Sequence, residues 1–433
     1  MHSDEILSLT VYQLFLRAFT KEGTLAAATR HLPEIKELGV DIVYVCPFMV
    51  EDEGEDRAFW SIRQKDSGLD NPKNPYRISD YFHVDPEYGD EKDLRAFVDE
   101  VHRLGMKVLF DLVYFHCGPN AVFLKEHPDF VRREKNGEFM LGDWCFPQLN
   151  YENPALREYL YSNMEYYMKE FSADGFRCDV GDRCPADFWL EGFRRCRKIN
   201  PEALFLCEGT PMKHSGFDFY YGFFHAEKLA GVLRGKLPLC ELKKEYLNHA
   251  ETYGNTVVLR DLDNHDYASN CGSTRFEVFP GHCGVEAALV LNAFMRGVFF
   301  VYNGNEIADT HPHNIFYNRF HAVKGDMTID WESENTPIAV ERKALVKKLI
   351  SLRHTLPAVA LGNLRFDGDS DAILAFTRRC AEQHLYCAVN LSAEKSTIDA
   401  KLLRDASPVL QKGAHFADGT LTLDGWGYAV YEI

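Results

Sequence analysis

The sequence has no long uninterrupted hydrophobic run and no basic N-terminal segment ahead of one. Its most apolar long stretch, residues 285–302, is interrupted by Asn292 and Arg296, so it predicts a helix followed by a strand and not a membrane span. The first residues, MHSDEILSLTVYQLF, show no secretory signal pattern. We therefore expect a cytoplasmic protein with no membrane partner.

Paired cysteine motifs are also missing. The chain contains 12 cysteines, but none of them forms a CxxC pair, and several lie inside apolar runs. Without a secretory signal, we expect free buried thiols in a reducing compartment, and neither disulfides nor a zinc site. No metal ion and no other cofactor is predicted. The cysteines are Cys46, Cys117, Cys145, Cys178, Cys184, Cys196, Cys207, Cys240, Cys271, Cys283, Cys380 and Cys387.

An excess of positive charge is absent as well. The formal net charge of −17 disfavours attraction to nucleic acid or to an anionic membrane, and it is compatible with a neutral substrate. The chain does contain 46% hydrophobic and 26% charged residues, which is an ordinary globular composition. Its 433 residues predict a large core and two or three domains. The oligomeric state stays open.

Apolar strand-like runs alternate with amphipathic helical stretches over most of the chain. This pattern predicts βα units around a parallel sheet. The runs are at residues 8–15, 40–47, 107–114, 173–180, 203–209, 217–221, 256–261 and 297–303. Helices are expected at residues 24–38, 91–104, 153–171, 185–200, 227–253 (in pieces), 284–295 and 337–356.

One unit departs from this alternation. Only residues 209–216 separate the fifth run from the sixth, whereas a crossover with a full helix needs about a dozen residues. Either this helix is truncated, or the sixth run is not a strand.

The whole pattern predicts an α/β architecture with three parts. Residues 1–113 and 154–356 would form a closed (β/α)8 barrel of the TIM type. Residues 114–153 would form a short inserted domain after the third strand, since loops of this length in a compact domain usually carry function or fold separately. Residues 357–433 show short alternating runs without helical spacing, which predicts a C-terminal β-sandwich.

Acidic residues stand where the apolar runs stop. Asp179, Glu208 and Asp266 follow three different runs, and Asp111 with His116 ends a fourth. In a parallel barrel the carboxyl ends of the strands meet at one face and carry the chemistry. Cleavage of a glycosidic bond with retention needs a nucleophilic carboxylate and a proton-donating carboxyl about 5 Å apart. Taken singly, Asp179 is better explained as a strand-end acid that pairs with an arginine, Glu208 could be an acid at a helix start, and Asp266 could belong to a polar turn.

The segments around these acids resemble the motifs of the α-amylase family of glycoside hydrolases, family thirteen. The four main motifs are matched in order by DLVYFH (111–116), GFRCDVGD (175–182), CEG (207–209) and LDNHD (262–266). Further matches are NPYRISDYFHVDPEYGD (74–90), FPQLN (146–150) and GVFFVYNGNE (297–306). The resemblance covers about residues 8–356. It implies that Asp179 is the nucleophile, Glu208 the general acid/base and Asp266 the stabiliser of the transition state.

The resemblance also implies supporting residues. Arg177 would keep the nucleophile ionised, and Asp111 would anchor Arg177. His116 and His265 would hydrogen-bond the sugar, and Tyr76 would stack under its ring. The residues themselves agree in part, because Arg177 lies two positions before the nucleophile on the same strand face, and a nearby cation lowers the pKa of a carboxylate.

Two positions depart from the family. Many members carry a calcium-ligating asparagine where this chain has Phe115, so we expect no calcium there. Many members have glycine-tyrosine-aspartate at residues 75–77, and in members that trim non-reducing ends this aspartate grips the terminal hydroxyls. Here Arg77 replaces it, in a loop with further basic side chains at Arg63, Lys65 and Lys73. We hypothesise that one of these residues recognises an anionic or unusual terminal sugar, and a solvated loop is the alternative.

The expected activity is hydrolysis of α-linked gluco-oligosaccharides, of the maltodextrin or isomalto type, through a covalent glycosyl-enzyme. The expected partner is an oligosaccharide substrate. A transglycosylase, isomerase or phosphorylase on the same scaffold stays open as an alternative, because these enzymes differ only in the acceptor. A noncatalytic relative is disfavoured, since all three acids are present.

Overall fold

The computed structural model describes residues 3–269, 274–320, 327–381 and 383–433. Cys271, one of the expected free thiols, lies outside these ranges. None of the described helices is long and apolar enough to cross a membrane. The cytoplasmic localisation stays a prediction.

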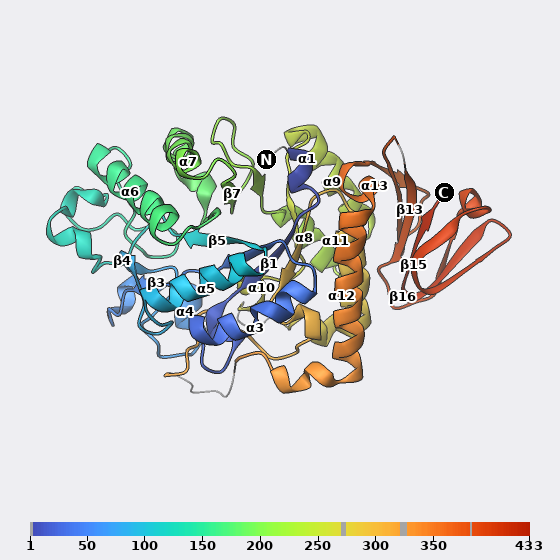
Figure 1. Cartoon of the computed structure of the whole chain (residues 1–433), viewed down its shortest axis with the longest axis horizontal. Coiled ribbons are helices and arrows are strands. Elements are labelled where there is room, and N and C mark those ends of the chain that lie inside the picture. Colours follow the sequence, from blue (N-terminus) through green and yellow to red (C-terminus); the bar gives the residue numbers. More distant parts are fainter. Residues whose placement is uncertain (1–2, 270–273, 321–326, 382) are drawn as a thin grey trace.

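A parallel eight-stranded barrel forms the centre of the molecule (Figure 1). The strands stand in the order β8-β7-β6-β5-β2-β1-β10-β9, and a parallel bridge from Tyr220 to Val258 brings the two ends of the sheet together. Each strand falls within one of the eight predicted runs, so the predicted fold class is confirmed. The strands are β1 (Thr10–Leu14), β2 (Ile42–Val45), β5 (Lys107–Leu112), β6 (Gly175–Cys178), β7 (Leu204–Cys207), β8 (Phe219–Tyr220), β9 (Leu259–Arg260) and β10 (Val298–Tyr302).

Helices cover the outside of the barrel where the sequence predicts them. In α5 (Glu91–Arg103), a capping box between Asp90 and Asp93 satisfies the first backbone N–H groups, and the apolar face of the helix is buried. Residues 208–218 contain no helix, so the crossover between β7 and β8 is truncated and the sixth run is a strand. The other long helices are α3 (Leu25–Glu37), α6 (Pro154–Glu170), α7 (Ala186–Ile199), α8 (Phe223–Leu233), α9 (Cys240–Tyr253), α11 (His282–Phe294) and α12 (Pro337–Thr355).

Two long segments follow strands of the barrel. Residues 48–85 contain the antiparallel pair β3 (Met49–Glu51) and β4 (Ile78–Val84), with the short α4 (Ile62–Asp66) between them. Residues 113–153 contain two 3-10 turns and isolated bridges. The Phe59 and Phe139 rings join the two segments, with centroids 5.9 Å apart. Both segments therefore lie over the same face of the barrel, at the carboxyl ends of the strands.

An antiparallel β domain follows the barrel and lies at the right in Figure 1. Its strands alternate between two cores, since Leu374 and Phe376 pack with the barrel and Ile373 and Ala375 pack inside the domain. The six strands are connected through the long β16. They are β11 (Asn363–Asp367), β12 (Ile373–Arg379), β13 (His384–Asn390), β14 (Ser396–Asp399), β15 (Ser407–Ala417) and β16 (Thr420–Glu432).

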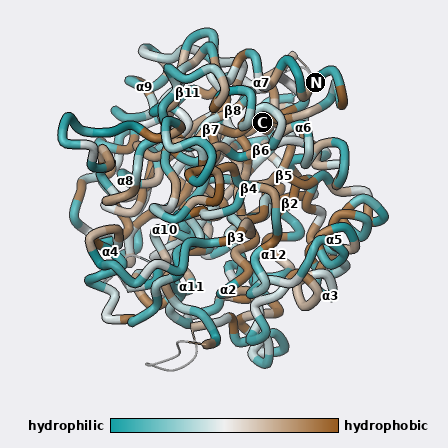
Figure 2. Tube along the Cα trace, turned by 90° about the vertical axis from the view of Figure 1, so that its left-hand side faces the viewer, coloured by the Kyte–Doolittle hydropathy of each residue, from teal (hydrophilic) through white to brown (hydrophobic). Residues whose placement is uncertain are grey.

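Hydrophobic residues gather on the central strands, and hydrophilic residues occupy the outer loops (Figure 2). Strands β1, β2 and β10 are buried along their whole length because helices cover one face and side chains fill the interior. All described cysteines are free thiols, as predicted. Cys240 and Cys283 correct the expectation of burial, because they lie exposed in the first turns of α9 and α11.

The fully buried Arg378 of β12 ties the β domain to the barrel. Its guanidinium donates hydrogen bonds to the carbonyl oxygens of Phe294, at the end of α11, and Gly362. We predict that Arg378→Met lowers the thermal unfolding midpoint, because each buried carbonyl left without a donor costs about 1–3 kcal/mol. Arg379→Met, at the exposed neighbouring position, is the matched control. Equal midpoints for the two variants would contradict this role.

Candidate active site

The register of β6 and β7 brings two acids to the same level. Cys178 pairs with Cys207, so Asp179 and Glu208 each stand one residue beyond this pair on neighbouring strands. Arg177 lies two residues before Asp179 and therefore projects from the same face of the strand. Its Nη1 lies 3.0 Å from Asp179 Oδ1, and its Nη2 lies 2.6 Å from Glu208 Oε2. One guanidinium thus holds both carboxyl groups.

A third carboxyl group lies beneath the pair. Asp111 of β5 pairs in register with Arg177 of β6, and Arg177 Nη1 donates to Asp111 Oδ1 at 2.6 Å. The Tyr44 hydroxyl donates to Asp111 Oδ2 at 2.7 Å. Burial raises the pKa of Asp111 to about 6, although the Arg177 cation opposes this rise. Burial, and then repulsion from Glu208, raises the pKa of Asp179 well above its ordinary value.

The backbone after each acid has a specific shape. Val180 has a φ of 38°, a left-handed conformation that is rare for a β-branched residue, and its N–H donates to Glu208 Oε2 at 3.0 Å. Gly209 has a φ of 151°, and a Cβ there would lie 2.4 Å from the Asp182 carboxyl group. The glycine of the third motif is therefore required by its backbone conformation and by close packing.

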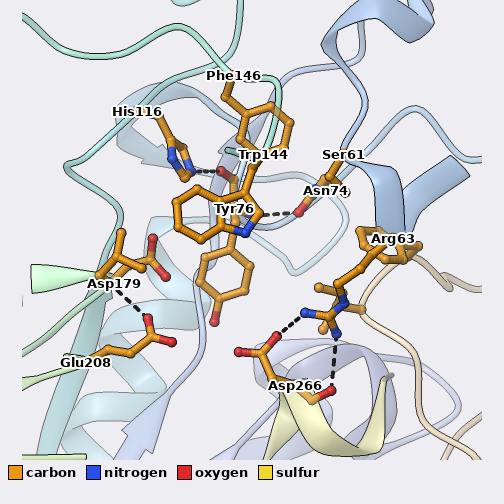
Figure 3. A pocket seen from close by; sticks show the side chains of 13 residues that line it. Ser61, Arg63, Asn74, Tyr76, His116, Trp144, Phe146, Asp179, Glu208 and Asp266 are labelled. Atoms are coloured by element: carbon orange, nitrogen blue, oxygen red, sulfur yellow. Dashed lines mark hydrogen bonds and ion pairs between the residues drawn. The ribbon is translucent and has the colours of Figure 1, made fainter. Parts of the chain in front are cut away.

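Asp266 stands on the opposite wall of the cavity, in the short helix α10 (His265–Ala268) (Figure 3). Arg63 Nη1 donates to Asp266 Oδ1 at 2.7 Å, and Nη2 donates to the Asp266 carbonyl at 3.1 Å. Burial opposes ionisation of Asp266, but His265, Arg63 and Arg177 outweigh it and hold the pKa well below the usual range. Because burial lowers the pKa of His265 to about 4, the two arginines provide this stabilisation at neutral pH.

Tyr76 lies between the two walls (Figure 3). Its hydroxyl donates to Asp111 Oδ2 at 3.1 Å and contacts His265 Nε2 at 2.6 Å. The other ring nitrogen of His265, Nδ1, contacts Gln13 Nε2 at 2.6 Å. Since a side-chain amide nitrogen can only donate, His265 carries its proton on Nε2 and donates to Tyr76. His265 therefore holds Tyr76 from behind, and its expected hydrogen bond to the sugar stays a prediction.

His116 lines the cavity beside Tyr76. Its Nε2 donates to the Tyr76 carbonyl at 2.9 Å, and within the described residues its Nδ1 has no hydrogen-bond partner. Burial lowers the pKa of His116 to about 4, so the ring is neutral at physiological pH. Nδ1 is then an acceptor that a sugar hydroxyl can use.

These side chains surround a cavity of about 310 Å³. The volume lies at the lower end of the range of about 300–1,000 Å³ for ligand pockets. Across the described ranges, no group of three or more His, Cys, Asp or Glu side chains is arranged to hold a metal ion. The cavity is lined by Ser61, Arg63, Asn74, Tyr76, His116, Trp144, Phe146, Asp179, Val180, Glu208, Asp266, Ile315 and Phe316.

Comparison with known proteins agrees with this geometry. A family model for the catalytic domain of α-amylase matches residues 13–146. The crystal structure of an α-amylase from Lactobacillus plantarum covers 100% of both chains, with a TM-score of 0.82 and 25% sequence identity. Residues 13–146 thus match the α-amylase catalytic domain, and the whole chain has the fold of that α-amylase.

Two curated relatives are similar to most of this chain over part of their own length. Neopullulanase 2 from Thermoactinomyces vulgaris is 25% identical over 410 residues, covering 87% of this chain and 64% of the relative. A maltogenic α-amylase from Bacillus acidopullulyticus is 24% identical over 427 residues, covering 89% of this chain and 65% of the relative. The chain thus spans just under two thirds of the length of these curated relatives.

Arg77 departs from its predicted role. It is fully buried and does not line the cavity. Its guanidinium donates to the carbonyl oxygens of Asp52, Gly54, Phe59 and Pro72, at 2.7–3.0 Å. The prediction that Arg77 contacts substrate is therefore corrected. At this position, where many members of the α-amylase family have an aspartate, the arginine instead holds both ends of the loop of residues 52–77.

Several residues of the site were not predicted from the sequence. Gln13 orients His265, and Trp144 and Phe146 form part of the cavity wall. Gln13 carried one signal, since it is a polar residue inside a buried apolar strand, and such a residue needs a polar partner. Trp144 carried none, because only the folding of residues 113–153 over the barrel brings it to the cavity.

We predict that Arg77→Met makes the loop of residues 52–77 more open to proteolysis. The reason is that buried carbonyl oxygens lose their donor at a cost of about 1–3 kcal/mol each. Limited proteolysis followed by mass spectrometry of the fragments measures this. Arg57→Met, in the same loop, is the control, because Arg57 is exposed and contacts the exposed Asp70 carboxylate and the face of the Trp60 ring. Equal proteolytic cleavage of the two variants would contradict the role of Arg77 in holding this loop.

Proposed function

We propose that the protein is a retaining α-glycosidase that hydrolyses α-linked gluco-oligosaccharides of the maltodextrin or isomalto type. One observation carries the proposal: Asp179 and Glu208 are held side by side by Arg177, across a cavity from Asp266. Closely spaced carboxyl groups of this kind are what retaining hydrolysis needs. The relatives named neopullulanase and maltogenic α-amylase support α-glucans as the substrate class.

In the first step, an oxygen of Asp179 attacks the anomeric carbon and the bond to the leaving oxygen breaks. Glu208 gives its proton to that oxygen, and the shortened oligosaccharide departs as an alcohol. The Val180 N–H, 3.0 Å from Glu208 Oε2, orients the acid for this transfer. The product of the step is a covalent glycosyl-enzyme ester on Asp179.

In the second step, Glu208 is a carboxylate and accepts a proton from water. The water oxygen attacks the anomeric carbon, and the ester bond to Asp179 breaks. Two inversions at this carbon give net retention. Asp266, kept ionised by Arg63 and Arg177, stabilises the positive charge that develops on the sugar ring in both steps.

The charge balance under the cavity suits this chemistry. Asp111, Asp179 and Glu208 share one cation, Arg177, so three negative charges at once are disfavoured. Burial and then repulsion from Glu208 raise the pKa of Asp179, so this carboxyl group keeps its proton to a higher pH than an isolated one does. A pair with one proton supplies one acid and one nucleophile.

We predict that Asp179→Asn and Glu208→Gln each abolish release of sugar from maltooligosaccharides. General acid catalysis alone contributes about 10²–10⁴-fold, and loss of the nucleophile removes the covalent route altogether. Steady-state hydrolysis rates measure the effect. Asp187→Asn, an exposed acid in α7, is the control and retains activity. Near-normal rates in either site variant would refute the assignment.

We further predict that Glu208→Gln lowers the pKa of Asp179, because it removes the neighbouring negative charge. The ionised nucleophile is lost as the pH falls through this pKa. In a plot of reaction rate against pH, the acid limb must therefore move to lower pH in the variant. Single-turnover release of fluoride from α-glucosyl fluoride measures this limb, since fluoride needs little help from an acid. A limb that stays in place or moves to higher pH would show that repulsion does not set the pKa.

A further inference from the structure

A second cavity lies on the flank of the barrel, between strands β8 and β9 and the helices α8 and α9, which are labelled at the left in Figure 2. Its volume is about 140 Å³, and it shares no lining residue with the active-site cavity. The space exists because α9 covers the barrel loosely: of the 14 residues of this helix, Leu242 alone is buried. The polar side chains of this second cavity take no part in the proposed hydrolysis.

Arg260 of β9 brings a positive charge to the second cavity. It is 4% exposed, and among the described residues its one hydrogen bond runs from Nε to the Arg296 carbonyl oxygen at 2.8 Å. Glu245 attracts the guanidinium, but over the same described ranges no carboxylate forms an ion pair with it. The Tyr246 ring, 5.5 Å away, offsets part of the charge. Because a buried charge is costly unless it is hydrogen-bonded, the terminal N–H groups need acceptors in the cavity.

Three further side chains of the cavity wall carry polar atoms without a hydrogen-bond partner in the described part of the chain. These atoms are His225 Nδ1, Glu245 Oε2 and His249 Nε2. His225 is 1% exposed, and its Nε2 lies 2.9 Å from Asn292 Oδ1, so Nε2 carries the proton and Nδ1 is an acceptor. Burial lowers the pKa of His225 to about 3 and that of His249 to about 4, so both rings are neutral at physiological pH. The wall therefore lacks donors for its acceptors as well as acceptors for Arg260.

This combination of polar groups favours a neutral ligand with hydroxyl groups. An anion would be attracted by Arg260 and repelled by Glu245, and a cation would meet the reverse. A hydroxyl group accepts a hydrogen bond from Arg260 and donates one to Glu245 or His225, so it satisfies groups of both kinds. A sugar carries several such groups on one small ring.

The size and the apolar part of the second cavity also suit a sugar ring. A cavity of about 150 Å³ holds a six-membered carbon ring, so about 140 Å³ admits the ring of one pyranose. An open groove of about 400 Å³ adjoins the cavity, and it has room for the groups attached to that ring. The groove and the cavity share Phe224, Glu245, His249 and Tyr253. Aromatic side chains form part of the cavity wall, as in most small-molecule sites, among them Phe223, Phe224, Tyr246 and Tyr253.

We propose that the second cavity is a sugar-binding site, separate from the active site, which holds one neutral pyranose ring through its hydroxyl groups. Arg260 donates hydrogen bonds to hydroxyl oxygens, and Glu245 and His225 accept hydrogen bonds from hydroxyl groups. The site goes beyond the proposed function and does not depend on it.

D-Glucose tests the site, and L-glucose is the control, because the mirror-image sugar changes the solvent equally but presents its hydroxyl groups in the wrong arrangement. Hydrogen–deuterium exchange, followed by mass spectrometry of peptides from residues 223–253, measures local opening of α8 and α9. At ten times its dissociation constant, a ligand lost on opening slows this exchange by about 10-fold. D-Glucose should slow exchange in α9, and L-glucose should leave it unchanged. Equal exchange rates with the two sugars would overturn the inference.

Peptides of the active site provide a separate readout in the same experiment. Residues 107–116 and 175–184 contain the strand ends and loops that hold the catalytic acids. Slower exchange in these peptides alone would overturn the second site and leave the proposed function standing. Slower exchange in α9 supports the second site whether or not the protein hydrolyses oligosaccharides, so the two proposals fail independently.

A variant of Glu245 tests the contact itself. Glu245→Met removes the acceptor oxygens and should weaken binding of D-glucose by about 10- to 100-fold, the range for hydrogen bonds to a charged group. Glu251→Met, an exposed position on the same helix, is the matched control with the same loss of charge, and it should bind like the wild type. Equal affinities of the two variants would overturn the site. Thermal unfolding midpoints show whether each variant is folded, and the comparison of D- and L-glucose on the wild-type protein decides the inference even if Glu245→Met does not fold.

Discussion

Arg177 is fully buried and faces three carboxyl groups at once. It contacts Asp111 beneath the cavity and Asp179 and Glu208 at its wall. Removal of one partner from a buried charged cluster costs about 3–5 kcal/mol, because the remaining charges lose their compensation. The relative positions of the two acids therefore depend on this one guanidinium. Three tyrosine rings, of Tyr44, Tyr76 and Tyr221, lie 5.6–5.7 Å from it and exclude water.

The same cluster sets the protonation of the site. Burial raises the pKa values of Asp111 and Asp179, and repulsion among three carboxyl groups that share one cation adds to the rise. Asp266, across the cavity, has the opposite environment, since Arg63 contacts it directly. Carboxyl groups within one cavity thus have different protonation states because their neighbours differ. This separation allows one fold to hold an acid, a nucleophile and a permanent anion together.

Much of the barrel was predictable from the sequence, and the reasons are local. Apolar runs such as 107–112 and 298–302 form strands because they are buried on both faces, and a helix such as α5 begins where Asp90 can cap it. Parallel strands end at one face, so the acids at the ends of the runs were expected to meet. The truncated crossover after β7 was visible as a spacing too short for a helix.

Side-chain direction in the loops was not predictable. Arg77, expected to contact substrate, instead donates to carbonyl oxygens of its own loop, and the position of His265 behind Tyr76 was not foreseen. A basic residue in a long loop has no periodicity to indicate which way it points. The sequence by itself determined the barrel, the order of its strands along the chain and the acids at their ends, because these depend on burial and on alternation within each strand. Only the tertiary structure decided that Arg63 crosses the barrel mouth to Asp266 while Arg77 turns inward, because that choice depends on which distant carbonyls and carboxylates the folded loops bring within reach.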